Sequence, residues 1–262
     1  MTALLFLICL AASVIGGICG IGGGVIIKPT LDAMNLMSVS AISFLSGLTV
    51  LSMSVVNVFR SRKTHLVELR IGSYLAVGAV IGGILGNVLF QSIKNSAGND
   101  YLVGMLQAIV LGIVTLLTLI YSLRLRERFP SYHVTNPIGC LSIGAGMGLI
   151  SAFLGIGGGP INLAVLFIAF SMETKKAAAN SLYIIMFSQL ASLVTSLTKS
   201  SVPDFPPIYL IAMVSAGISG GLIGCRLNKR ISSELTDKLF AGLLCVIILI
   251  CIYNVVRFAA MC

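Results

Sequence analysis

Charged side chains are scarce in this sequence: they make up 10% of its 262 residues, whereas 57% are hydrophobic. Soluble domains carry about 25% charged residues, with which they cover their surface. No charge occurs in the intervals 33–59, 71–93, 101–123, 134–172, 177–198, 205–225 and 239–256. Most can cross a bilayer once as a helix, which takes about 20 apolar residues, and none alternates like a barrel strand. The sequence therefore predicts an all-α integral membrane protein.

Residues for catalysis and metal binding are equally few. The two histidines, His65 and His133, lie in predicted loops, and the seven cysteines form no Cys-x-x-Cys pair. The His-Glu-x-x-His zinc motif and the Gly-x-x-x-x-Gly-Lys nucleotide loop are both missing. Among the acids, only Asp32 falls within a hydrophobic segment. We therefore expect no enzyme, no metal and no cofactor, and a secondary carrier is a simpler interpretation than ATP-driven transport.

The net charge of +9 does not indicate nucleic-acid binding, because the Lys and Arg residues lie in short loops between apolar intervals. Four lie in 60–70, three in 124–133 and four in 226–238, against one each in 94–100 and 199–204. Cytoplasmic loops of membrane proteins are enriched in Lys and Arg. The first three loops are therefore predicted to be cytoplasmic and the other two external.

Three motifs occur twice. Gly20-Ile21-Gly22-Gly23-Gly24 returns as Gly155-Ile156-Gly157-Gly158-Gly159 at a spacing of 135 residues. At a spacing of 138, Ala41-Ile42-Ser43 corresponds to Ala179-Asn180-Ser181, and Gly82–Gly86 corresponds to Gly220–Gly224. Such self-similarity indicates a duplicated transporter unit.

The charge pattern also predicts how each unit is threaded. The uncharged stretch 134–172 would be about 58 Å long as one helix, too long for one span, and both of its flanks are basic. A hairpin that turns at the glycines fits, and the same reasoning makes 1–37 a hairpin that enters from outside. Each unit then has an odd number of crossings, so the two repeats are predicted to be inverted. The expected order is a first repeat 1–123 (hairpin 1–37, spans about 38–59, 71–93 and 101–123), a cytoplasmic linker 124–135, and a second repeat 136–262 (hairpin 136–172, spans about 177–198, 205–225 and 239–257).

The glycine breaks are the first candidates for a substrate site. A helix break frees backbone N–H and C=O groups, which membranes tolerate only inside protein or beside a water-filled cavity. Half-helices that start near Val25 and Pro160 would present free N–H groups to an anion. The candidate residues are Gly22, Gly23, Gly24, Gly157, Gly158 and Gly159. The alternative is that these glycines only allow tight packing, which is the favoured interpretation for Gly82 with Gly86 and for Gly220 with Gly224.

Polar side chains within the spans are the second group of candidates. Lys28 and Asp32 lie four residues apart on one helix face. They either neutralise each other, or Lys28 binds an anion while Asp32 acts as a proton-coupling residue. The uncharged candidates are Ser43, Ser181, Asn180, Asn162, Asn57 and Gln189, of which Ser43 and Ser181 rank first because both copies supply a serine.

These motifs resemble the TauE/SafE family of sulfite and organosulfonate exporters over nearly the whole chain. The resemblance rests on Gly20–Gly24 followed by Pro29, on the run Gly155–Asn162, on Ala178–Leu182 and on the glycine-rich third spans. It implies export of small sulfur-containing anions across the bacterial cytoplasmic membrane. The chain departs from an even duplication because Lys28, Pro29 and Asp32 have no counterparts in the second copy.

The apolar spans, the repeated glycine breaks and the resemblance together lead us to expect secondary transport of a small sulfur-containing oxyanion, such as sulfite or an organosulfonate. Transport would occur by alternating access around the two glycine loops. The alternative is a passive anion channel that uses the same loops as a filter. A scaffold without transport would not need two costly breaks. The expected partners are the anion and the lipid bilayer, with proton coupling and a homodimer left open.

Overall fold

The computed structural model describes residues 2–61, 66–125, 132–199 and 202–260. Over these residues it contains helices and no strand, which confirms the predicted all-α class. Eight helices are long and apolar enough to span a membrane: α1 (Thr2–Cys19), α3 (Val39–Ser61), α4 (Leu69–Ala97), α5 (Asp100–Ile120, continued by the π-helical turn Tyr121–Leu125), α6 (Pro137–Leu154), α8 (Thr174–Thr198), α9 (Pro207–Arg230) and α10 (Ser233–Ala259). Two are shorter, α2 (Gly24–Met34) and α7 (Gly159–Phe170).

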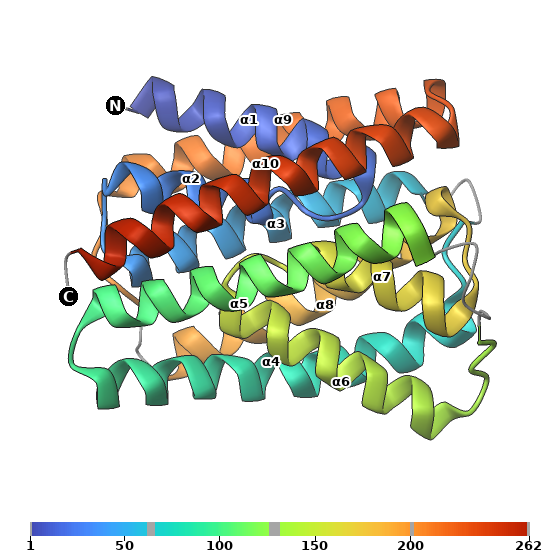
Figure 1. Ribbon diagram of the computed structural model, residues 1–262, viewed down its shortest axis with the longest axis horizontal. Coiled ribbons are helices and arrows are strands. Elements are labelled where there is room, and N and C mark those ends of the chain that lie inside the picture. Colours follow the sequence, from blue (N-terminus) through green and yellow to red (C-terminus); the bar gives the residue numbers. More distant parts are fainter. Residues whose placement is uncertain (1, 62–65, 126–131, 200–201, 261–262) are drawn as a thin grey trace.

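The two short helices are the second arms of two hairpins. In each hairpin a long helix, α1 or α6, ends at the glycine motif, and α2 or α7 starts within it. The turns need glycine because Gly22 and Gly157 have φ of 73° and 80°, a region that other residues rarely adopt. At 1.5 Å per residue α2 and α7 are about 16 and 18 Å long, roughly half of a bilayer core. Figure 1 shows α2 near the end of the bundle where α1 begins, and α7 near the opposite end.

Glycines bring neighbouring helices into backbone contact. A Cβ built on Gly82 of α4 would overlap the carbonyl oxygen of Ala145 on α6. In the other half, a Cβ built on Gly224 of α9 would lie 2.6 Å from the carbonyl oxygen of Val14 on α1. The packing interpretation of these glycine pairs is therefore confirmed.

Helix packing follows the same pattern in both halves. Helix α4 packs on α6 and α8, as α9 packs on α1 and α3, and α5 contacts α7 as α10 contacts α2. Helix α3 packs on α8, α5 on α10, and α2 on α7. A duplicated unit would produce this pattern, and the inverted relation of the two repeats stays a prediction.

The helix bounds correct one detail of the repeat. Helices α3 and α8 begin at Val39 and Thr174, which are 135 residues apart, as the two breaks are. Helices α4 and α9 begin at Leu69 and Pro207, 138 residues apart, so the extra residues of the second half lie between α8 and α9. The predicted pairing of Ser43 with Ser181 is therefore wrong, because Ser43 corresponds to Ala178.

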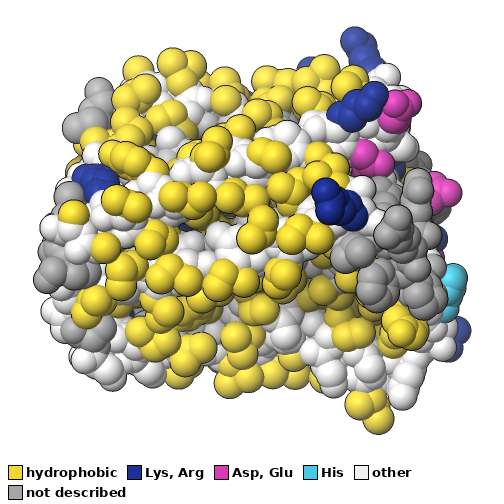
Figure 2. All heavy atoms as spheres, viewed as in Figure 1, with side chains coloured by type: hydrophobic (Ala, Val, Ile, Leu, Met, Phe, Trp, Pro, Cys, Tyr) yellow, Lys and Arg dark blue, Asp and Glu magenta, His cyan; other side chains and the backbone are white. Residues whose placement is uncertain are grey.

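The two ends of the bundle differ in charge. Helix α1 begins and α10 ends at one end, here called the terminal end, and Lys, Arg, Asp and Glu gather mainly at the other, the charged end (Figures 1 and 2). Between the ends the visible surface is largely hydrophobic (Figure 2). The positive-inside rule predicts that the charged end is cytoplasmic. Parts of the predicted loop 60–70, with His65, and of the linker 124–135 lie outside the described residues.

Candidate functional site

A cavity of about 250 Å³ lies between α3, α4, α6 and α8, and we call it the large cavity. It reaches from Lys94, Val202 and Pro203 at the terminal end to Gly155, the first glycine of the second break. Its lining residues are Ser40, Ser43, Phe44, Gly47, Leu48, Asn87, Phe90, Gln91, Lys94, Ala152, Phe153, Gly155, Gln189, Ser192, Leu193, Ser196, Val202 and Pro203.

The lining offers hydrogen-bond donors and one positive charge. Serine hydroxyls and the amides of Asn87, Gln91 and Gln189 supply the polar groups, and Lys94 supplies the charge. Among the described residues that line it there is no Asp or Glu. Such a lining suits a small anion, because hydroxyl, amide and ammonium groups all donate to oxyanions.

Two hydroxyls of the lining lack a partner. Ser40 Oγ and Ser43 Oγ are buried without a hydrogen bond to any described residue. By contrast, Asn87 Nδ2 donates to Ser192 Oγ at 3.0 Å and to Ser196 Oγ at 2.9 Å, which fixes α4 to α8. Buried polar groups without partners are rare in native proteins. Because these two hydroxyls also belong to the lining of the large cavity, they are candidates for contact with water or a ligand there.

None of the six predicted site glycines lines this cavity, although Gly155 of the same motif does. A Cβ built on Gly22 would contact Val50 and Ile185, and one built on Gly157 would contact the same two side chains. A Cβ on Gly24 would overlap the carbonyl of Ile156, and one on Gly159 would overlap Val25. Gly23 lies against α1, where its Cβ would be 3.2 Å from the Ala12 carbonyl, and Gly158 lies against Asn162. In this arrangement the glycines let the two breaks pack on each other, and their contact with substrate stays a prediction.

The uncharged candidates separate in space. Ser43 and Gln189 line the large cavity, whereas Ser181, Asn162 and Asn57 are buried without lining it. Ser181 Oγ and Asn162 Oδ1 have no hydrogen-bond partner among the described residues. Asn180 holds the segment before α4, because its Oδ1 accepts from Glu68 N at 3.1 Å and its Nδ2 donates to Leu66 O at 3.1 Å.

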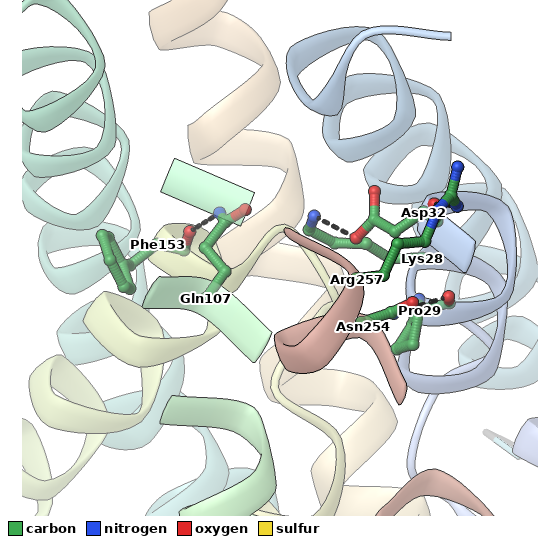
Figure 3. A network of polar contacts seen from close by, with 7 residues as sticks. All are labelled: Lys28, Pro29, Asp32, Gln107, Phe153, Asn254 and Arg257. Atoms are coloured by element: carbon green, nitrogen blue, oxygen red, sulfur yellow. Dashed lines mark hydrogen bonds and ion pairs between the residues drawn. The ribbon is translucent and has the colours of Figure 1, made fainter. Parts of the chain in front are cut away.

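Lys28 and Asp32 belong to a different polar cluster, between α2, α5 and α10 (Figure 3). Lys28 Nζ lies 2.9 Å from Asp32 Oδ2, with both side chains buried, and Arg257 of α10 donates to the carbonyls of Asp32 and Ala33. Asn254 Nδ2 donates to Pro29 O at 2.8 Å, and Gln107 Nε2 to Phe153 O at 2.6 Å. A cavity of about 10 Å³ beside them has room for about one water molecule. Lys28 does not line the large cavity.

Most lining residues of the large cavity did not figure among the sequence candidates, although the sequence carries a signal for them. Asn87, Gln91 and Lys94 are spaced by four and three residues in an apolar span, so they share one face of α4. Gln189, Ser192 and Ser196 form a similar stripe on α8. Two polar stripes at helical spacing, in spans that are otherwise apolar, predict a shared polar cavity better than single residues do.

The chain was compared with known proteins. Residues 5–250 match the family model described as Sulfite exporter TauE/SafE. No curated protein and no solved structure gives a match. Within the described residues, no three His, Cys, Asp or Glu side chains come together to hold a metal ion. The proteins of this family are transporters rather than enzymes, which agrees with eight membrane-spanning helices around a polar cavity. The chain therefore belongs to the TauE/SafE family of sulfite exporters, and it is a multi-pass membrane transporter.

Proposed function

We propose that the chain is a secondary carrier that exports a small sulfur-containing oxyanion and binds it in the large cavity, in contact with Ser43 and Gln189. The observation that carries this proposal is the lining of that cavity, which has hydroxyls, amides and Lys94 but no described acid. A sulfite or sulfonate group has three oxygens that accept hydrogen bonds, so several donors can bind it at once.

The shape of the interior favours a carrier over the alternative of a passive channel. The side chains of Val50, Ile156 and Ile185 lie next to the glycines of the two breaks and are at most 1% exposed, so the space between the breaks is filled. A channel needs a continuous wet path, whereas a carrier opens to one side at a time. The packed breaks therefore support alternating access, in which the hairpins move against α3 and α8.

A binding assay on purified protein tests the substrate. Thermal stabilisation is measured across sulfite, thiosulfate, sulfoacetate, sulfate and short carboxylates, and sulfur oxyanions should stabilise most strongly. Ser43→Ala should weaken their binding by about 10- to 100-fold, since a hydrogen bond to a charged group contributes about 1.5–3 kcal/mol. Ser46→Ala is the matched control, because Ser46 is buried on the same helix without lining the cavity. Equal effects of the two variants would remove Ser43 from the binding site.

Transport in liposomes distinguishes the two mechanisms. A carrier shows saturable flux that is stimulated by substrate on the opposite side, and a channel shows ohmic single-channel currents. Ohmic currents carried by sulfite would refute the carrier.

Proton coupling through Asp32 stays a prediction. The groups that face it are Lys28 on its own helix and Arg257 on α10. If Asp32 carries the proton, Asp32→Asn should keep anion exchange and lose uptake driven by a pH gradient. Loss of both activities would instead indicate a structural role.

A further inference from the structure

A second, much smaller cavity lies at the charged end of the bundle, and we call it the small cavity. Its volume is about 30 Å³, and it lies between α1, α3, α8 and α9. Its lining residues are Gly17, Asn57, Ser61, Leu66, Lys175, Ala178, Ala179, Leu182, Cys225, Asn228 and Lys229.

The repeat relates this lining to that of the large cavity. Equivalent residues are 135 positions apart in the breaks and in the pair α3 and α8, and 138 positions apart in the pair α4 and α9. By these spacings, ten of the eleven residues that line the small cavity correspond to residues that line the large cavity. The pairs are Gly17 with Ala152, Asn57 with Ser192, Ser61 with Ser196, Lys175 with Ser40, Ala178 with Ser43, Ala179 with Phe44, Leu182 with Gly47, Cys225 with Asn87, Asn228 with Phe90 and Lys229 with Gln91. The two cavities therefore occupy equivalent places in the two halves and lie at opposite ends of the bundle.

We propose that the small cavity is the closed, inward-facing counterpart of the large cavity and binds the same small oxyanion when it opens. This inference rests on the proposed function, and it adds a second binding site and the residues that form it. The structure then represents the outward-open state of the carrier. Exchanging the conformations of the two halves produces the inward-open state, in which the large cavity is closed.

Specific contacts hold the small cavity closed. Asn228 Nδ2 donates to the carbonyl of Ile18, which ties α9 to the last turn of α1. A Cβ built on Gly20 would overlap Ala178 on α8, but one built on Gly155 would lie 2.8 Å from the equivalent Ser43, so this contact is present in both halves. The residues equivalent to Asn228 and Ile18 are Phe90 and Phe153, and the Phe153 carbonyl accepts from Gln107 of α5 instead. The hydrogen bond between Asn228 and Ile18 therefore exists in one half only.

The charge of the small cavity specifies its ligand. Lys175 and Lys229 stand where the large cavity has Ser40 and Gln91, and no Asp or Glu is among the described residues that line it. Lys175 Nζ donates to Ile231 O at 2.8 Å, which holds the ammonium group at the cavity rim. The inward-facing site is thus more positive than the outward-facing one, which favours loading of an anion from the cytoplasm.

A native cysteine makes this testable. Cys225 lines the small cavity and is buried, and its equivalent in the large cavity is Asn87. One variant keeps Cys225 as its only cysteine, and a second carries Asn87→Cys on a cysteine-free chain. A third keeps only Cys140, which is buried but lines neither cavity, and serves as the control. Each is labelled with a small membrane-impermeant thiol reagent in inside-out and right-side-out vesicles.

Sulfoacetate is the probe, because sulfite itself attacks thiol reagents. We expect Cys225 to be labelled from the cytoplasmic side only, Asn87→Cys from the external side only, and Cys140 from neither. Saturating sulfoacetate should slow both cavity reactions at least about fivefold, and Lys229→Gln should reduce the protection of Cys225. A carrier that transports sulfoacetate while Cys225 stays unreactive from both sides would overturn the second site. If neither sulfoacetate nor sulfite crosses the membrane, and sulfoacetate does not protect Asn87→Cys, the proposed function itself fails.

A substitution in the otherwise unchanged chain tests the same proposal if the cysteine-free chain does not transport. Cys225→Trp fills the small cavity and should hold the carrier in its outward-open state, so that sulfoacetate still stabilises the protein but transport falls to background. Cys245→Trp is the control, because Cys245 is exposed on α10 and lines neither cavity. Normal transport by Cys225→Trp would contradict the proposal.

Discussion

The burial of the ion pair on α2 predicts how much folding free energy is lost when one of its partners is replaced. Lys28 Nζ and Asp32 Oδ2 are 2.9 Å apart, and their side chains are 3% and 7% exposed. Asp32→Asn keeps the shape of the side chain and removes its charge. The Lys28 ammonium group is then buried without a counter-ion, since Arg257, the other described charge beside it, is also positive.

Breaking one partner of a buried ion pair costs about 3–5 kcal/mol of folding free energy, because the remaining charge stays desolvated. Replacing both partners restores a neutral site, so Lys28→Met combined with Asp32→Asn should recover most of that loss, to within about 1 kcal/mol of the parent. The two substitutions are therefore strongly non-additive.

The free energy of unfolding is measured by SDS titration of protein in mixed micelles, as a double-mutant cycle. The control cycle uses Glu234 and Lys238, which have the same spacing but are 78% and 72% exposed. Their coupling should stay below about 0.5 kcal/mol. If Asp32→Asn is as mild as Glu234→Gln, or if the double variant is no more stable than the single one, the pair does not hold α2 in place.

Three further predictions concern backbone contacts. Gly82→Ala should cost about 1–3 kcal/mol because its Cβ would overlap the Ala145 carbonyl, whereas Gly146→Ala, which has open space around it, should be neutral in the same melting assay. Gly158→Ala places a Cβ at a φ of 95° and only 2.5 Å from the Asn162 amide. The melting temperature of the Gly158→Ala protein should therefore fall further than that of the Gly98→Ala protein, in which backbone strain at a φ of 61° acts without a steric overlap. Asn180→Ala should speed proteolysis of the segment before α4, because two hydrogen bonds to that segment are lost, and an unchanged cleavage rate would refute this role.

The sequence was sufficient for the architecture because membranes impose strong local rules. Uncharged intervals locate the spans, and the two glycine motifs mark where α1 and α6 end. Span limits were less accurate. The last span was predicted to begin at 239, whereas α10 begins at Ser233, because Glu234, Asp237 and Lys238 lie in helix turns that extend beyond the apolar core.

The candidate site was predictable only in part. Ser43 was selected because Ser181 was taken as its counterpart in the second repeat, a pairing that the helix bounds contradict. The polar stripes on α4 and α8 become a cavity only through the packing of four helices. The glycines drew attention because helix breaks are costly in lipid. In the structure each break is buried inside the protein against the other break, through contacts between residues 132 to 138 positions apart that no local pattern reveals.

The packing of the two glycine breaks on each other also limits how the two halves of the chain can diverge in sequence. All five residues of the break motif are identical in the two halves, whereas only one of the ten equivalent pairs in the cavity linings is identical, Ser61 with Ser196. A change in one break must be accommodated by the other, so neither copy can vary alone. In the proposed carrier the linings face different compartments, and they carry no such mutual constraint. In that carrier the two faces could become chemically different, so that each could bind the anion with a different affinity.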